Sequence, residues 1–262
     1  AKRCAEIVDR GGKGWAGLRC ATIANMENEQ NTQAAAPIDQ PCSEAANDTS
    51  AEINLAEFDV ILASGSPRRK QLMEDAGIAF DVRVSDVDEQ LDADLLADPP
   101  EAAKKLAERK AGAVVQEVLS EDYLGMAMVL GADTMVVCDG EIFGKPQNLS
   151  DAKHMLRCLE GRTHEVLTAV SVWLVAAPEP EKISLGFRTF VDATAVTFRA
   201  LSDEEIDDYL RQGESFDKAG AYAIQGAGAA LVERIDGALD TVIGMPVGRL
   251  LEEFPDLVAP VA

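Results

Sequence analysis

An apolar run meets a basic turn in the stretch Phe58-Asp59-Val60-Ile61-Leu62-Ala63-Ser64-Gly65-Ser66-Pro67-Arg68-Arg69. The first half, residues 58–63, predicts a buried strand. Ser66 followed by proline is typical of an N-cap with proline at the first helical position, so a helix is expected to begin there. The stretch therefore predicts a strand that turns directly into a helix, as in α/β folds.

The first turn of this expected helix carries three cations, Arg68, Arg69 and Lys70. Because a helix N-terminus has a partial positive charge and favours Asp or Glu, the arrangement costs free energy unless an anion lies beside it. Free backbone N–H groups, the hydroxyls of Ser64 and Ser66 and two guanidinium groups are donors that suit a phosphate group. We therefore expect a phosphate site here, and the alternative is a solvated basic turn.

Downstream of this junction, strand and helix signals alternate to the end of the chain. Strands are expected at about 79–84, 126–137, 164–176, 187–198 and 229–235. Helices are expected from Ser66 to about Gly77, at about 98–119, 150–159 and 202–213, and from about Pro246, with Asp98, Ser150 and Ser202 as caps. The strands at 164–176 and 187–198 are interpreted as antiparallel neighbours. The expected class is α/β, with a mixed, partly antiparallel central sheet flanked by helices.

Composition narrows the functional classes. The chain has 262 residues, enough for one domain or for two lobes of one domain. A net charge of -22 argues against general binding of nucleic acid or of anionic membranes, since both rely on a basic surface. In so acidic a chain, a local basic cluster favours a small polyanion as its ligand.

The cysteines and histidines show no metal-ligand spacing. Five scattered cysteines indicate free thiols in a reducing compartment. His154 and His164 lack partners at ligand spacing and are interpreted as structural. No apolar run is long enough to span a membrane and no secretory signal is recognised, so a cytoplasmic location without membrane contact is expected.

The beginning of the chain differs in composition from the rest. Residues 26–53 are polar, lack aromatic side chains and show no period, which predicts disorder. We expect a disordered extension over residues 1–55 and one domain over residues 56–262.

Asp133 interrupts an apolar strand, Val129-Leu130-Gly131-Ala132-Asp133-Thr134-Met135-Val136-Val137. A carboxylate in such a run is costly unless a cation, a metal ion or a set of hydrogen bonds meets it. Because α/β sheets bind ligands at the carboxyl ends of central strands, the position favours a metal ligand or a general base. The alternative is an aspartate that caps a turn at the end of the strand.

Four further residues are weaker candidates when judged locally. Lys145 lies between glycine and proline, which suits a fixed charge against phosphate, although an exposed loop lysine fits equally well. Glu89 belongs to an acidic stretch typical of solvated surface, and Lys110 is in mid-helix, where an exposed lysine is the usual explanation. The small-residue loop 217–226 allows a ligand to approach the backbone and supplies Gln225 as a donor; a plain glycine-rich loop is the alternative.

Five motifs follow one another along the chain: Ser64-Gly65-Ser66-Pro67-Arg68-Arg69, Gly131-Ala132-Asp133-Thr134, Gly144-Lys145-Pro146, Asp217-Lys218-Ala219-Gly220-Ala221-Tyr222 and Ile224-Gln225-Gly226. In this order and spacing the chain resembles the Maf family of nucleoside triphosphate pyrophosphatases over about residues 58–255. The segment Ala132-Asp133-Thr134 resembles the branch of the family that acts on dTTP and UTP. The extension before residue 56, and Met245 where leucine is usual, depart from the family pattern.

The resemblance implies an elongated fold with a cleft between two lobes, and metal-dependent cleavage between the α and β phosphates of a nucleoside triphosphate. By position, Asp133 matches the catalytic proton acceptor, and Glu89 matches a further active-site position. The expected cofactor is Mg²⁺ or Mn²⁺, bound by acidic residues such as Glu89 and Asp133, and the sequence does not decide which carboxylate binds the metal and which acts as the base. The residues that match substrate-binding positions are Ser64, Ser66, Arg68, Arg69, Lys110, Lys145 and Gln225, of which Arg69, Lys145 and Gln225 are associated with specificity. Homodimers are common in the family.

Two other classes of function are kept as alternatives. A nucleotide-binding regulator of cell division and septum formation would keep the pocket and make hydrolysis incidental. A nucleotidyltransferase or kinase would need a different phosphate loop, and the chain contains no G-x-x-x-x-G-K-[ST] sequence. Release of pyrophosphate separates the hydrolase from the regulator.

Overall fold

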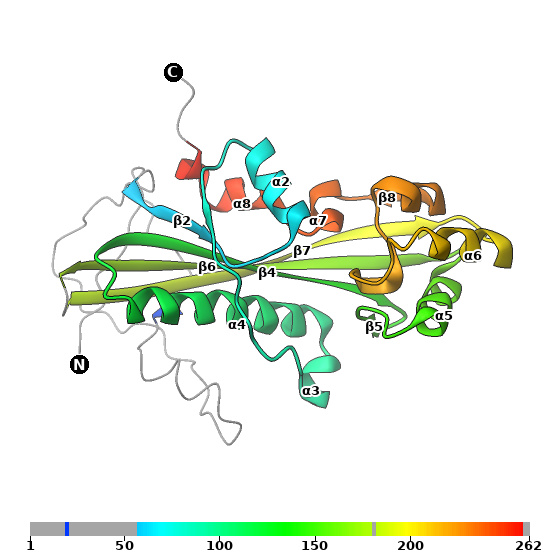
Figure 1. Cartoon of the computed structure of the whole chain (residues 1–262), viewed down its shortest axis with the longest axis horizontal. Helices are drawn as coiled ribbons and strands as arrows, with labels where there is room; N and C mark the ends of the chain where they lie inside the picture. The colour runs from blue at the N-terminus through cyan, green and yellow to red at the C-terminus, as the bar shows by residue number, and fades with distance from the viewer. Residues whose placement is uncertain (1–18, 21–56, 180–181, 259–262) are drawn as a thin grey trace.

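One mixed sheet runs along the molecule and is covered by helices on both faces (Figure 1). The computed structural model describes residues 19–20, 57–179 and 182–258. In this part of the chain the strands are β1 (Arg19–Cys20), β2 (Asp59–Leu62), β3 (Asp81–Val82), β4 (Gly125–Cys138), β5 (Glu141–Phe143), β6 (Thr163–Glu179), β7 (Lys182–Phe198) and β8 (Val232–Asp236). Their order is β1-β7-β6-β4-β2-β3, with β5 beside β4 and β8 beside β7.

Parallel and antiparallel pairs occur together in this sheet, which confirms the predicted fold class. Strand β2 is parallel to β3 and to β4, whereas β4, β6 and β7 pair antiparallel along their length. The antiparallel pairing predicted for the two long strands is confirmed, with Ala169 opposite Val191 at the centre. Because β4 is buried on both faces, it needs the near-continuous apolar sequence that made it recognisable.

Helices of different lengths pack on the two faces of the sheet. They are α2 (Pro67–Asp75), α3 (Ala93–Leu96), α4 (Pro99–Ser120), α5 (Leu149–Leu159), α6 (Asp203–Arg211), α7 (Leu239–Ile243) and α8 (Val247–Glu253). Helices α2, α7 and α8 lie on one face and α4 on the other, while α5 and α6 lie at the far end beside β5 and β8 (Figure 1). One apolar cluster joins α2 and α8 to the sheet and a second joins α5 and α6, so the elongated molecule has two lobes.

Two of the four predicted helix caps, Asp98 and Ser202, form the expected capping bonds. The Asp98 side chain accepts from the backbone N–H of Glu101, and Ser202 forms a full capping box with Glu205. Ser66 is the N-cap of α2 as predicted, although its side chain makes no capping bond. The prediction that Ser150 caps α5 is wrong, because the side chain of Asn148 accepts the N–H of Asp151 at 3.0 Å and starts the helix earlier.

Three strands are shorter than predicted. Strand β2 covers Asp59–Leu62 of the expected 58–63. Strand β3 covers only Asp81–Val82 of the expected 79–84, because only these residues pair with β2. Strand β8 begins at Val232 because a 3₁₀ helix, Gly226–Leu231, occupies the residues before it. The predicted disorder over 1–55 lies outside the described residues, apart from Arg19–Cys20, which pair with β7.

None of the helices in the described part of the chain has the length and apolar character needed to cross a membrane.

Candidate active site

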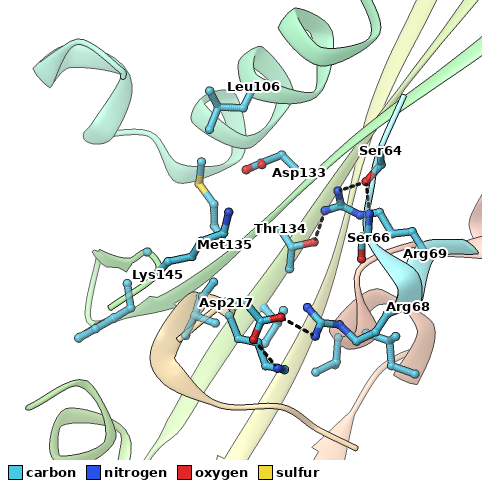
Figure 2. A pocket seen from close by; sticks show the side chains of 18 of the residues that line it. Ser64, Ser66, Arg68, Arg69, Leu106, Asp133, Thr134, Met135, Lys145 and Asp217 are labelled. Carbon is cyan, nitrogen blue, oxygen red and sulfur yellow. Dashed lines mark hydrogen bonds and ion pairs between the residues drawn. The ribbon is translucent and has the colours of Figure 1, made fainter. Parts of the chain in front are cut away.

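A gap along one edge of β4 creates the site. Strand β2 pairs with β4 only as far as Leu62 opposite Leu130, and β5 joins the same strand from Val136 onward. In the described part of the chain, no strand pairs with β4 on this edge between the two. Asp133 lies in the middle of the gap, between Leu130 and Val136. The gap opens into a pocket of about 560 Å³ (Figure 2).

All nine site residues predicted from the sequence line this one pocket. They come from the turn after β2, from α2, the segment between β3 and α3, α4, β4, the loop after β5 and the loop 217–225. The nine are Ser64, Ser66, Arg68, Arg69, Glu89, Lys110, Asp133, Lys145 and Gln225. Their shared location is an observation of the structure, whereas their chemical roles stay predictions.

Arg69 is held in place by three hydrogen bonds. Its Nε donates to the carbonyl oxygen of Gly244 at 2.7 Å, and its two terminal nitrogens donate to the hydroxyls of Ser64 and Thr134, each at 3.2 Å (Figure 2). A guanidinium has five N–H donors, so two remain for a ligand. Burial lowers the pKa of Arg69, and the charge of Asp133 opposes that effect. The side chain is thus a fixed cation at the pocket wall.

Arg68 is less constrained than its neighbour. Its only ion pair in the described part of the chain is with Asp217 at 3.7 Å, and a third of its side chain is exposed. Asp217 also accepts from Lys218, whose ammonium donates to the Glu214 carbonyl as well. An ion pair of this length is weak, because solvent screens it. Arg68 can therefore exchange Asp217 for an anionic ligand at small cost.

Lys110 connects the two carboxylates of the pocket. Its ammonium nitrogen lies 2.6 Å from Oδ1 of Asp133 and 2.7 Å from Oε1 of Glu89. Only 14% of the lysine side chain and 11% of Asp133 are exposed, while Glu89 is half exposed. The local interpretation of Lys110 as an exposed helical lysine is therefore wrong, whereas Glu89 is exposed as its acidic stretch suggested and also pairs with Lys110. The carboxylate that is costly in an apolar strand is met by a cation.

Close packing of α4 on β4 brings Lys110 to Asp133. Gly131, two residues before Asp133, faces the backbone of α4, and a Cβ atom added there would lie 2.5 Å from the carbonyl oxygen of Ala107 and 2.7 Å from the nitrogen of Ala111. Only glycine allows this separation. The glycine of the Gly131-Ala132-Asp133-Thr134 motif therefore sets the distance between helix and strand.

Two opposing effects act on Glu89. Partial burial raises its pKa, but the hydrogen bond from Lys110 and the charges of Lys110, Lys145 and Arg69 outweigh burial, so the pKa of Glu89 lies below its usual value. The carboxylate is therefore ionised at neutral pH. Lys145 is exposed and contributes to the site through its charge.

Gln225 and Ser66 also line the pocket. Gln225 is exposed and precedes the 3₁₀ helix Gly226–Leu231, and its side chain makes no capping bond there. The backbone N–H of Ser66 donates to the hydroxyl of Ser64 at 3.3 Å, which turns the chain into α2.

The carboxylates of the pocket suit a divalent cation whose other ligands would be phosphate oxygens. In the described part of the chain, no group of three or more His, Cys, Asp or Glu side chains is arranged as a metal cage. Asp133 and Glu89 nevertheless lie on either side of one ammonium group. Mg²⁺ is commonly held by one or two carboxylates together with substrate phosphates and water. These two carboxylates are the residues that would hold it.

Cations outnumber anions in the pocket although the whole chain has a net charge of -22. The cationic lining residues are Arg68, Arg69, Lys110, Lys145 and Lys218, and the anionic ones are Glu89, Asp133 and Asp217. Field lines concentrate in a cleft, so a local surplus of positive charge attracts anions even on an acidic protein.

Sequence reasoning missed the apolar wall and one hydroxyl of the pocket. The apolar wall includes Leu91, Leu96, Leu106, Met135 and Ile142, and a flat nucleobase would find van der Waals contact there. Thr134 was quoted within a motif but given no role, and it bonds Arg69. The alternation of side chains along β4 could have identified Thr134, because it directs Asp133 and Thr134 to opposite sides of the strand.

Comparison with known proteins identifies the family to which the chain is similar. The sequence profile described as Maf-like protein matches residues 59–257, which include every lining residue. A protein from Bacillus velezensis named dTTP/UTP pyrophosphatase is 46% identical over 198 residues, covering 74% of this chain and 96% of that protein. One of the same name from Bacillus thuringiensis subsp. konkukian is 44% identical over 195 residues, covering 74% of this chain and 93% of that protein.

Proposed function

We propose that this chain, which belongs to the Maf family, hydrolyses dTTP and UTP to the nucleoside monophosphate and pyrophosphate. The observation that carries the proposal is the pocket in which Asp133 lies beside Lys110 and near the fixed cation Arg69, where neither β2 nor β5 pairs with β4. The names of the relatives support pyrimidine nucleoside triphosphates as the substrate class.

The cations of the pocket bind and orient the triphosphate in this proposal. Arg69 presents two free N–H donors from a fixed position, and Arg68 leaves its weak ion pair with Asp217 to join it. The unpaired N–H groups in the first turn of α2 point to the same anion, and Lys145 adds a charge from the other lobe. Preorganised donors of this kind stabilise the charge that develops on the leaving pyrophosphate.

Asp133 acts as the general base. Lys110 bonds its Oδ1, and no described residue donates a hydrogen bond to Oδ2, which is therefore available to a water molecule. Asp133 accepts the proton of that water as it attacks the α-phosphorus, and the bond to the β-phosphate oxygen breaks. Lys110 holds the carboxylate in this orientation. When bound by Glu89 and Asp133, Mg²⁺ or Mn²⁺ would supply charge neutralisation on the phosphate oxygens.

A nucleotide panel with and without divalent metal tests the proposal. Pyrophosphate and monophosphate should appear in equal amounts from dTTP and UTP, and turnover should stop when metal is chelated. Asp133→Asn keeps the shape of the side chain and removes the base, so kcat should fall at least about a hundredfold, the lower range for a general base. Near wild-type kcat in this variant would remove the base role. Nucleotide binding without turnover by the wild-type protein would favour a regulator instead.

The proposed location is the cytoplasm. Cys138 and Cys158 are free thiols in the structure, as expected in a reducing compartment. Dimer formation stays a prediction, and size-exclusion chromatography with light scattering measures it directly.

A further inference from the structure

A chain of hydroxyl groups leads from Arg69 into the interior of the protein. Thr134 and Thr168 are directly opposite each other in the β4–β6 pair, and their hydroxyl oxygens are 3.0 Å apart. The Thr168 hydroxyl in turn bonds the carbonyl oxygen of Thr241, in α7, at 2.7 Å. Thr168 and Thr241 are fully buried, so water does not offer Thr168 a substitute partner.

The donor and the acceptor in each of these hydrogen bonds follow from the groups at the two ends of the series, a carbonyl oxygen and a guanidinium. A carbonyl oxygen only accepts, so Thr168 must donate its single proton to Thr241. Thr168 can then only accept from Thr134, which must donate in that direction. Thr134 consequently has no proton for any other group. Its remaining lone pairs face the terminal nitrogen of Arg69, which can only donate.

The arrangement makes Thr134 a dedicated acceptor for Arg69. Hydrogen bonds in a one-directional chain polarise one another, so the bond to the guanidinium is stronger than an isolated hydroxyl would provide. The same guanidinium also bonds the Gly244 carbonyl, which directly follows α7. Arg69 is thus tied to α7 by two routes, one direct and one through the threonines.

We propose that Thr168 is a positioning residue of the phosphate site, which acts through Thr134 to hold the guanidinium of Arg69 where the triphosphate binds. The inference rests on the proposed function, since it assigns the role of a residue outside the pocket in that reaction. Thr168 does not line the pocket, and in the described part of the chain its hydroxyl bonds only Thr134 and the Thr241 carbonyl, although Asp192 is directly opposite it on β7.

Replacement of Thr168 by valine tests this role, because valine keeps the shape of the side chain and removes the hydroxyl. Thr134 then has no acceptor for its proton, so its hydroxyl can rotate and no longer offers Arg69 a fixed lone pair. We expect kcat/KM for UTP to fall about tenfold, the effect of one charge-assisted hydrogen bond. Thr168→Ser restores the hydroxyl and should recover most of the activity.

Two competitive inhibitors separate positioning from general damage. Inorganic tripolyphosphate represents the charged tail of the substrate, and uridine represents the nucleoside without it. In Thr168→Val the inhibition constant of tripolyphosphate should rise about tenfold, while that of uridine should change less than about twofold. A defect of packing alone would weaken both inhibitors alike.

Thr194→Val is the matched control. Thr194 is equally buried, lies on the neighbouring strand β7 and bonds both the N–H and the carbonyl of Ala238, just before α7. It anchors the same segment and has no hydroxyl contact with Thr134. The control should lose stability in urea to a similar extent while keeping kcat/KM within about twofold of wild type.

A double-mutant cycle completes the test. Because Thr168 acts through Arg69, adding Thr168→Val to Arg69→Lys should lower kcat/KM by much less than it does in the wild type. Equal losses in both backgrounds, or a Thr168→Val enzyme with wild-type inhibition constants, would overturn the inference. The proposed function fails separately, if the wild-type protein releases no pyrophosphate from UTP.

Discussion

The substitution Gly131→Ala tests whether the close packing of α4 on β4 builds the site. The added Cβ would lie 2.5 Å from the Ala107 oxygen, 2.7 Å from the Ala111 nitrogen and 2.8 Å from the Ala111 Cβ. Real Cβ atoms do not approach other atoms within 3.0 Å, and two of these three neighbours are backbone atoms that no side-chain rotation can move. Helix α4 must therefore shift away from β4, by about half an ångström or more in a close-packed interior.

This shift of α4 should lower both the stability of the protein and its kcat. Overpacking of a filled core typically costs about 1–3 kcal/mol, so the free energy of unfolding should fall by that amount. Lys110 is on the same helix, and its 2.6 Å contact with Asp133 depends on the helix position. Small displacements of catalytic groups lower the rate steeply, although a flexible lysine recovers part of the contact, so kcat should fall about tenfold.

Gly112→Ala on the same helix is the matched control. A Cβ there would meet only a ring carbon of Trp173 at 3.9 Å, an ordinary contact. Replacing a helical glycine by alanine removes backbone entropy from the unfolded chain, so this variant should gain up to about 1 kcal/mol. Urea denaturation followed by circular dichroism and steady-state hydrolysis of UTP measure both quantities. A Gly131→Ala enzyme with unchanged stability and kcat would refute the claim that the close approach of α4 builds the site.

Two further predictions concern stability. Burial lowers the pKa of His164 to about 4. Below pH 6.5 the unfolded chain therefore binds a proton at this side chain, while the folded protein keeps it neutral. The free energy of unfolding should fall by about 3 kcal/mol between pH 6.5 and pH 4. His164→Gln, measured by urea denaturation across this range, should remove that part of the pH dependence, and an unchanged slope would contradict it. Asn148→Ala should lower the free energy of unfolding by about 1 kcal/mol, because α5 loses its cap. Ser150→Ala should change it by less than about 0.5 kcal/mol. Equal losses in the two variants would contradict the assignment of Asn148 as the cap.

Long elements with a clear pattern were predictable from the sequence. Strands β4, β6 and β7 are long apolar runs, and α4 combines a cap with an apolar stripe, so pattern and structure agree. Helices α3 and α7 and strand β5 were not predicted, because elements of three to five residues show no measurable period. Their form is determined by what they pack on. For α7 this includes the buried threonines beneath it.

The cap of α5 shows how two adequate local signals compete. Both Asn148 and Ser150 are good N-cap residues, and the sequence rules rank them about equally. The structure resolves the choice in favour of Asn148, whose side chain also brings Asp151 to accept the N–H of Gln147. A second hydrogen bond at the same helix start is a property of the folded turn, which a list of single-residue preferences does not contain.

Lys110 shows which part of the site the sequence contained and which part it did not. The buried face of α4 includes Ala103, Leu106, Ala107, Ala111 and Val114. Residue 110 falls on this stripe at helical spacing, so the periodicity itself placed a lysine on the apolar face, and a buried ammonium requires a carboxylate or loses its charge. A carboxylate partner was therefore implied by the pattern. The partner is Asp133, 23 residues away, because Gly131 lets α4 approach β4 closely. The sequence does not show this contact, since it depends on how the helix and the strand pack together.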